Sequence, residues 1–327
     1  MEDLRVAATP TPMTTRKPAA AGRSTKAPPG WARRRPASRP AAGVHEGVVP
    51  PELRSADRGD RIQKVLAEAG VASRRECESM VRRGLVAVNG KPVTALPAWV
   101  DPESDHIEVE GRALRRRRPG NEAKIVVALH KPRRVICTSR DPEGRKRAVD
   151  LVNLPHRLFC VGRLDADSTG LILLTNDGEL ANHLTHPRYE VPKWYQVSIR
   201  GRLTIEDVQR LREGLYLATR GDAGKAPAAK ASVSRVRLLA AGTDQKGAAH
   251  SRLEIMLHEG RNRQLRRLLA RLGCKVRRLE RIAIGPIRLK GLSVGGWRKL
   301  TGSEIGKLHE AAGLPRPQPA RGRGARS

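Results

Sequence analysis

The first helical periodicity along the chain falls within residues 62–70. Its apolar residues recur three and four positions apart, as on one face of a helix: Ile62, Val65, Leu66 and Ala69. A second helix is predicted directly afterwards, because Ser73 and Glu76 form the sequence signature of a capping box. The alternating stretch LVAVNGKPV then predicts a β-hairpin that turns at its Asn-Gly pair. Residues 58–112 are therefore expected to form a small module of two short helices and a hairpin.

A larger region, residues 124–312, mixes strand and helix patterns. Strands are predicted over residues 125–129, 170–175, 195–199, 232–239 and 252–257. Helices are predicted over residues 178–184, 204–213 and 262–272. Because the two patterns do not alternate strictly, this region is expected to be an α+β domain with a mainly antiparallel mixed sheet and flanking helices.

Three further segments lack apolar periodicity. Residues 1–57 are rich in Pro, Ala, Arg and Thr, and too few large apolar groups are present to offset the chain entropy lost on folding. A disordered basic arm is expected there, and residues 313–327 are expected to form a similar disordered basic tail. Residues 113–123 contain a Pro-Gly break and are expected to be a linker.

The net positive charge of the chain indicates what kind of partner it binds. The chain has 64 Lys and Arg against 33 Asp and Glu, a formal net charge of +31. Residues 1–57 and 315–327 account for +5 and +4 of this charge, which leaves +22 on the rest of the chain. Such an excess favours a polyanionic partner, because each phosphate that a cation neutralises releases bound counterions. Nucleic acid is the expected partner.

Composition disfavours several classes of protein. Aromatic residues make up 2% of the chain, which argues against an RNA-recognition sheet built on stacked aromatic platforms. The four cysteines lie far apart without a CxxC pair, so neither a zinc ribbon nor a disulfide framework is indicated, and a reducing cytosol fits. No apolar run approaches the roughly 18 residues of a membrane span. A cytoplasmic protein without a membrane partner is expected.

Charged residues interrupt the apolar stretch CVGRLDADSTGLILLTNDGEL at residues 160–180. Arg163, Asp165 and Asp167 precede a run that predicts a buried strand, so the acids are expected in a loop at its start. Alone, the two acids fit a turn in which a side-chain oxygen accepts from a backbone amide, or the carboxylate pair of a glycoside hydrolase. The basic charge and the scarcity of aromatic platforms for sugar disfavour the hydrolase.

Two other stretches carry candidate chemistry. EVPKWYQV places Lys193 and Tyr195 together in a chain that is nearly free of aromatic residues. HEGRNRQLRRLLARLG predicts a helix with a leucine core stripe. Arg266 lies beside that stripe, near its apolar edge, where a guanidinium needs an anion.

These stretches together resemble the motifs of the ribosomal RNA pseudouridine synthases of the small-subunit synthase A and large-subunit synthase B family. GRLDADSTGLILLTNDGEL is similar to the catalytic motif, LHKP to the first motif, and KWY and EGRNRQLRRLL to the second and third. DPEGR and LANHLTHPRYEV are closer to the large-subunit branch. The resemblance spans about residues 60–310 and implies a pseudouridine synthase catalytic domain at 124–312. One departure is Arg134, at a position where the family commonly has glycine, which adopts positive φ easily.

The N-terminal module resembles the alpha-L RNA-binding domain first known from a small-subunit ribosomal protein. The resemblance covers about residues 60–107 and rests on RIQKVLAEAGVASRRECESMVRRGLVAVNGK. Its polar positions are mostly positive rather than mixed, which favours an RNA-binding face over a solvated helix face. The cations expected to bind RNA are Lys64, Arg74, Arg75, Arg82, Arg83 and Lys91.

The family resemblance also implies roles for single residues. Asp165 is expected to be the catalytic aspartate, Tyr195 to pack on the target uracil, and Arg266 to be the basic partner of the aspartate. Asp167 is expected to be a turn residue. Further cations are expected to contact RNA: Arg163, Lys193, Arg261 and Arg263. No redox step or net hydrolysis is involved, so neither a cofactor nor a metal is expected.

The expected function is isomerisation of a uridine in ribosomal RNA, with the large subunit favoured, after the base has been flipped out of its helix. A monomer acting on ribosomal RNA or on a pre-ribosomal particle is expected. The alternative is a non-catalytic RNA-binding ribosome assembly factor, which the basic charge and the N-terminal module alone would support. That alternative would not need Asp165, Tyr195 and Arg266 together.

Overall fold

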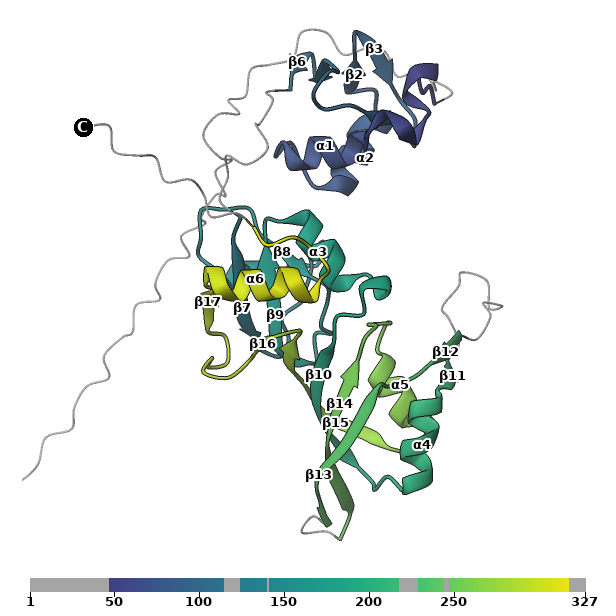
Figure 1. Ribbon diagram of the computed structural model, residues 1–327, viewed down its shortest axis with the longest axis vertical. Coiled ribbons are helices and arrows are strands. Elements are labelled where there is room, and N and C mark those ends of the chain that lie inside the picture. The colour runs from purple at the N-terminus through teal and green to yellow at the C-terminus, as the bar shows by residue number, and fades with distance from the viewer. Residues whose placement is uncertain (1–46, 115–123, 140, 218–228, 244–246, 318–327) are drawn as a thin grey trace, which may run out of the picture. The chain divides into compact units, whose positions relative to one another are not determined.

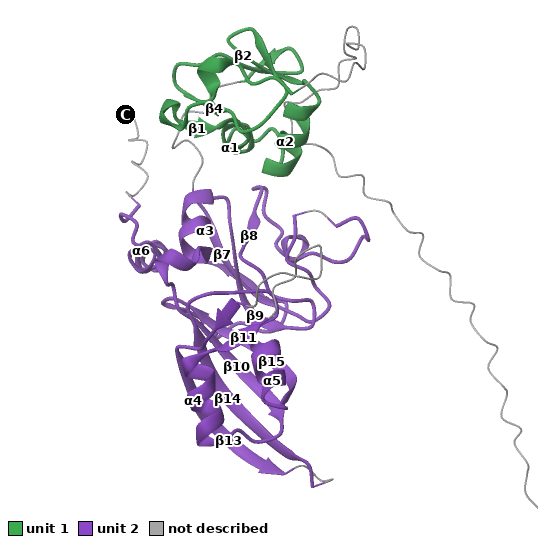
Figure 2. Cartoon of the chain, turned by 90° about the vertical axis from the view of Figure 1, so that its right-hand side faces the viewer, with its two compact units in different colours: residues 1–118 green, residues 119–327 purple. Residues whose placement is uncertain are grey.

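The chain forms two compact units, residues 1–118 and 119–327 (Figure 2). The computed structural model describes residues 47–114, 124–139, 141–217, 229–243 and 247–317. Most of the expected basic arm, linker and tail therefore lies outside the described residues.

The first unit packs two helices with a small antiparallel sheet. The helices are α1 (Ile62–Glu68) and α2 (Arg74–Arg82). The sheet has the order β3-β2-β5-β6, with β2 (Val86–Val88), β3 (Lys91–Val93), β5 (Ile107–Val109) and β6 (Arg112–Ala113), while β1 (Asp60–Arg61) pairs with β4 (Trp99–Val100). The Ser73 half of the predicted capping box is confirmed, since the Ser73 hydroxyl accepts from the Glu76 N–H. The predicted turn is also confirmed, since both turn residues, Asn89 and Gly90, have positive φ.

Ordered structure begins earlier in the first unit than the sequence predicts. Two short 3-10 helices, η1 (Pro51–Leu53) and η2 (Ala56–Arg58), lie in the segment expected to be part of the arm. Leu53 is 1% exposed and joins the core that α1, α2 and the sheet share. The prediction of disorder up to residue 57 is thus wrong for residues 47–57. Leu53, Val49 and backbone hydrogen bonds of Val48 hold this segment, and such scattered contacts produce no periodic signal.

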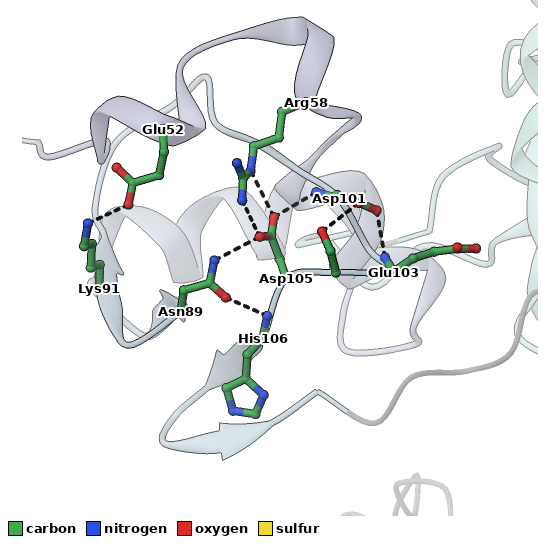
Figure 3. A network of polar contacts seen from close by, with 9 residues as sticks. Glu52, Arg58, Asn89, Lys91, Asp101, Glu103, Asp105 and His106 are labelled. Atoms are coloured by element: carbon green, nitrogen blue, oxygen red, sulfur yellow. Dashed lines mark hydrogen bonds and ion pairs between the residues drawn. The ribbon is translucent and has the colours of Figure 1, made fainter.

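A buried carboxylate connects three parts of the first unit (Figure 3). The Asp105 side chain is 2% exposed, and it accepts hydrogen bonds from the Arg58 guanidinium at 2.5 Å, the Asn89 amide at 2.9 Å and the Asp101 N–H at 2.9 Å. Burial disfavours the ionised form, but these donors hold the pKa of Asp105 below its usual value. The network ties η2 to the hairpin turn and to the loop before β5.

The second unit is built on a nine-stranded sheet (Figure 1). Its main order is β13-β14-β10-β15-β9-β7-β17, with β8 added to β9 and β16 added to β15. Among the described strands, every pair in this sheet is antiparallel except β15 with β9. The strands are β7 (Val126–Lys131), β8 (Phe159–Val161), β9 (Thr169–Thr175), β10 (Lys193–Arg200), β13 (Arg235–Thr243), β14 (Ala249–Leu257), β15 (Lys275–Ile284), β16 (Ile287–Arg288) and β17 (Trp297–Lys299).

Helices lie on both faces of this sheet. Ile172 and Leu174 of β9 pack into a core that includes residues of α4 (Ile205–Glu213) and α5 (Gln264–Arg271). Leu171 and Leu173 point the other way, into a core that includes residues of α3 (Gly178–Thr185) and α6 (Gly302–Ala311). The remaining elements are η3 (Ala148–Leu151), η4 (Pro187–Tyr189) and a small hairpin of β11 (Leu215–Leu217) with β12 (Ala229–Ala231). The α+β class and the mainly antiparallel sheet are therefore as predicted.

The predicted strands and helices are all present, with ends displaced by up to four residues. Strand β13 is the most displaced, since it begins at Arg235 and ends at Thr243. Strand β15 and helix α6 were not predicted. The prediction of a tail from residue 313 is wrong for its first residues, because Leu314 packs against the α3–α6 core.

We expect Asp105→Ala to destabilise the first unit by about 3 kcal/mol, since Arg58 would lose its carboxylate and the Asp101 N–H its acceptor. Amide hydrogen exchange of β2 and β5 in the full chain would show this as faster exchange. Glu103→Ala, which removes an exposed acid from the same loop, is the matched control and should leave exchange within about twofold. Equal exchange in the two variants would contradict the assignment.

Candidate active site

The loop that joins β8 to β9 carries the predicted acids and is fixed by backbone contacts. The N–H of the buried Leu164 donates to Sγ of Cys137 at 3.4 Å, and the carbonyl of Ala166 accepts from the N–H of Arg134 at 2.6 Å. The Ser168 N–H closes a turn on the carbonyl of Asp165 at 3.1 Å. These contacts hold the loop between the end of one strand and the start of the next.

Arg134 adopts a φ of +64° in the turn that holds this loop. That backbone region suits glycine, and a side chain there costs on the order of 1 kcal/mol. The Arg134 N–H points to the acid-bearing loop nevertheless. Arg134 therefore adopts the conformation expected of a glycine at this position, and its N–H contacts the acid-bearing loop.

Both acids meet arginines at the start of α5. Asp167 forms ion pairs with Arg263 at 3.2 Å and with Arg266 at 3.2 Å, while Asp165 pairs with Arg263 at 3.6 Å. Arg266 also donates to the Ser168 hydroxyl at 3.2 Å. The expected pairing of Arg266 with Asp165 is thus replaced by a shared arrangement in which Arg263 bridges the two carboxylates.

Local backbone geometry explains this exchange of partners. Arg263 is the N-cap residue of α5 and has a left-handed φ of +48°, which directs its side chain to the loop rather than along the helix. Arg266 lies one turn later, and its side chain is 13% exposed. It reaches Asp167 and Ser168, at the far end of the loop from Asp165.

The electrostatics favour ionised acids. Burial opposes ionisation of Asp167, but the hydrogen bond from Arg263 and the charges of Arg266 and Arg263 lower its pKa below the usual value. Burial lowers the pKa of Arg266, and the carboxylates of Asp167 and Asp165 oppose that shift. Nε of Arg266 is buried without a hydrogen-bond partner among the described residues. Asp167, expected to be a simple turn residue, is therefore the main anion that holds this arginine.

Tyr195 and Arg281 lie opposite each other on neighbouring strands. They are paired in the register of β10 and β15, and they are 7% and 3% exposed. The Arg281 guanidinium donates to the carbonyls of Leu171 at 2.7 Å and Arg163 at 3.5 Å. Tyr195 also shares a core with Leu164, the residue before Asp165. Arg281 thereby links the strand of the tyrosine to the loop of the acids.

Two lysines are buried around the same strands. Lys131 is fully buried at the end of β7, and its ammonium donates to the carbonyls of Pro132 and Val135. Lys193 is 7% exposed at the start of β10, and its ammonium donates to the carbonyls of Val191 and His258. Burial, with the charge of Arg281 in addition, lowers the pKa of Lys193 to about 8. Lys193 is therefore a buried cation held by backbone carbonyls, and its expected contact with RNA stays a prediction.

Some of the other cations expected to contact RNA pair with carboxylates of the chain, and others make no salt bridge with a described residue. Arg163 is exposed beside Asp165. Arg261 forms an ion pair with Glu259 at 2.9 Å, Lys64 with Asp60 at 2.7 Å, and Lys91 with Glu52 at 2.7 Å. The remaining four are exposed, lie in α2 or at its C-terminal end, and make no salt bridge with a described residue: Arg74, Arg75, Arg82 and Arg83.

Sequence reasoning missed Arg281 and Lys131 as parts of the site. In β15, Leu279, Arg281 and Ala283 alternate and are all buried, so Arg281 occupies an apolar-face position of a strand. This alternation is the signal in the sequence that could have identified Arg281. The alternation is hard to recognise because the strand opens with the charged run KVRR and pairs with β10 through two irregularities.

The arrangement offers a carboxylate beside guanidinium groups, at the edge of a core that contains a tyrosine. Among the described residues, no group of three or more His, Cys, Asp or Glu side chains could hold a metal ion. None of the helices in the described ranges is long and apolar enough to span a bilayer. A carboxylate held in this way can act as a nucleophile or as a base.

The chain is similar to known proteins over most of its length. The sequence profile described as RNA pseudouridylate synthase matches residues 125–271, and the S4 domain profile matches residues 60–96. An uncharacterized RNA pseudouridine synthase of Aquifex aeolicus is 41% identical over 256 residues, which cover 78% of this chain and 95% of that protein. The ribosomal large subunit pseudouridine synthase B of Bacillus subtilis is 41% identical over 254 residues, or 77% of this chain and 97% of that protein.

A crystal structure of a pseudouridylate synthase is 28% identical, with a TM-score of 0.49, and the match covers 76% of this chain and all of that one. The identity to the two relatives extends over nearly their whole length. The chain therefore belongs to the RNA pseudouridine synthase family, with an S4 domain ahead of the catalytic domain.

Proposed function

We propose that the protein isomerises a uridine of large-subunit ribosomal RNA to pseudouridine, with Asp165 as the catalytic residue. The observation that carries the proposal is the position of Asp165, in a loop fixed at the start of β9 and paired with Arg263 at 3.6 Å. The choice of large-subunit RNA is supported by the 41% identity to the Bacillus subtilis protein of that name.

The chemistry requires uracil to be cut from ribose at nitrogen 1, rotated and rejoined through carbon 5. A carboxylate can attack as a nucleophile or remove a proton, and both roles need its ionised form in a shielded place. Desolvation opposes that form, and a guanidinium offsets the penalty. Arg263 supplies this charge directly to Asp165, whereas Arg266 holds Asp167 and the far end of the loop.

The target base must leave its helix before it can reach Asp165. Flipping costs a few kcal/mol of stacking, which contacts in the pocket must offset. In the proposal, the ring of Tyr195 stacks on the uracil and its hydroxyl assists proton removal from carbon 5. The exposed Arg163, two residues before Asp165, occupies the place that the base vacates.

RNA capture is assigned to residues 58–112 and catalysis to residues 124–312, joined by residues 113–123. The four arginines of α2 and its C-terminal end support this division, because they are exposed and make no salt bridge with a described residue. We infer that the protein acts in the cytoplasm as a monomer, on ribosomal RNA or on a pre-ribosomal particle.

The same arginines favour a second candidate function, that of a non-catalytic ribosome assembly factor. Incubation of ribosomal RNA tritiated at uridine carbon 5 separates the two functions. Release of tritium to water supports the synthase, whereas RNA binding without release supports the assembly factor.

We expect Asp165→Asn to lower the tritium-release rate more than a hundredfold while RNA affinity stays within a few-fold, because the charge is lost and the shape is kept. Asp167→Asn should cost about tenfold, since Arg263 and Arg266 lose their stronger anion. Glu179→Gln, an exposed site on α3, is the matched control for an acid-to-amide change. A larger loss at Asp167 than at Asp165 would move the catalytic role to Asp167.

Replacing the four arginines in α2 and at its C-terminal end by glutamine is expected to flatten the salt dependence of RNA binding. Each lost phosphate contact removes about 0.9 from the logarithmic slope, so four contacts would remove about 3 to 4. Lys64→Gln with Lys91→Gln is the control, since both lysines already pair with carboxylates, and its slope should change by less than about 1. Equal changes in the two variants would refute the assignment of α2.

Lys193 is expected to make the stability of the second unit depend on pH. Its folded-state pKa of about 8 lies below the usual value of 10.5, so between these values the unfolded chain binds a proton that the folded chain releases. Stability should therefore rise with pH, by about 2 kcal/mol between pH 7 and pH 9.5. Denaturant unfolding of the parent and of Lys193→Met would show a rise that the variant lacks. A parallel rise in both would place the titrating group elsewhere.

A further inference from the structure

Among the described residues, one face of the large sheet is covered over only part of its width. The α3–α6 core covers the part formed by β7, β8 and β9. The same face continues over β10, β14 and β13, which contribute no residue to that core among the described parts of the chain. In Figure 1 these strands and the start of β15 extend well beyond α6. Tyr195 and α5 belong to the opposite face.

Strand register gathers positive charge on this uncovered part. Arg200 of β10 pairs with His250 on β14 and with Lys275 on β15. In the next row, Ser198 pairs with Arg252 and Arg278. Side chains of paired residues share one face of a sheet at about 5 Å separation. We call Arg200, Arg252, Lys275 and Arg278 the basic sheet face; all four are exposed.

Few acids neutralise this group. Arg278 has a partner in Glu280 at 3.2 Å, and Glu280 also faces His130 at 3.3 Å. Arg200, Arg252 and Lys275 make no ion pair with a described residue. Like charges held on neighbouring strands repel one another, so the arrangement costs stability in the absence of an anion.

The surface also has a recess between two of these cations. A shallow hollow is lined by Arg200, Gly201, Ala248, Ala249, Gly273 and Lys275. Apart from the two cations, its lining residues are glycines and alanines, whose small side chains leave the two charged groups uncrowded. Such a surface suits phosphate oxygens, which accept hydrogen bonds from Arg and Lys side chains.

We propose that the basic sheet face binds the phosphate backbone of a second segment of the RNA substrate, on the face of the sheet opposite to that of Tyr195 and α5. This inference rests on the proposed function, because it takes RNA as the substrate. RNA is favoured over an acidic protein because protein interfaces need buried aromatic or aliphatic anchors. The central position of the basic sheet face is Ser198, a small polar residue.

The test compares two triple variants with equal loss of charge. Arg200→Gln/Arg252→Gln/Lys275→Gln removes the unpaired cations of the basic sheet face. Arg288→Gln/Lys290→Gln/Lys307→Gln, on β16, the loop after it and α6, is the control with exposed cations elsewhere. Binding to a full-length large-subunit ribosomal RNA transcript is measured across salt concentrations. The logarithmic salt slope should fall by about 2 to 3 in the first variant and by less than 1 in the control.

The single-turnover rate is measured alongside, on a short RNA at saturating concentration that contains the target uridine. Both variants should keep the parent rate within twofold, because the short RNA does not reach the basic sheet face. Equal slope changes in the two variants, or no change in either, would overturn the proposal. A parent protein that binds RNA but forms no pseudouridine would instead refute the proposed function, and the slopes would still report on the basic sheet face.

Discussion

The large sheet depends on one short parallel contact between β9 and β15. Only two residue pairs define it, Thr169 with Glu280 and Gly170 with Arg281. On one side lie the antiparallel strands β13, β14, β10 and β15, and on the other β9, β7 and β17. Gly170 makes the contact possible, because a Cβ at this position would lie 2.3 Å from the Arg281 carbonyl oxygen. With a φ of +110°, the position also requires the freedom of glycine.

We call the contact between β9 and β15 the seam. The candidate site lies at the seam because its residues come from the strands on both sides of this contact. The acid-bearing loop precedes β9, whereas Tyr195 and the α5 arginines belong to the other group of strands. The Arg281 guanidinium crosses the seam to the carbonyls of Leu171 and Arg163. A buried cation is usually paired with a carboxylate, but the Arg281 guanidinium is hydrogen-bonded to backbone carbonyl oxygens instead. Nη2 of Arg281 has no hydrogen-bond partner among the described residues, so the seam holds a guanidinium that is only partly satisfied.

Sequence patterns were enough for the local elements and for placing the two acids in a loop ahead of β9. Ser73, Asn89 and Gly90 act through contacts within a few residues of themselves, and such contacts leave a signature in the sequence. The pairing of Arg263 with Asp165 could not be read in this way, since it depends on a left-handed residue at the start of α5. The burial of Lys193 was missed for a related reason, because a lysine is normally exposed and only the tertiary fold buries this one. Strand β15 was missed because bulges break its alternation and four of its ten residues are Lys or Arg.

The seam also sets an order of events while the chain is being made. Arg163 and Arg281 are 118 positions apart, so the seam cannot close until the ribosome has synthesised β15. The first unit, in contrast, has all of its described strands by residue 113. At roughly 5 to 20 residues per second, the interval from residue 113 to residue 281 lasts on the order of 10 to 30 s. During translation, all residues of the S4 domain are therefore synthesised well before the last residues of the candidate active site.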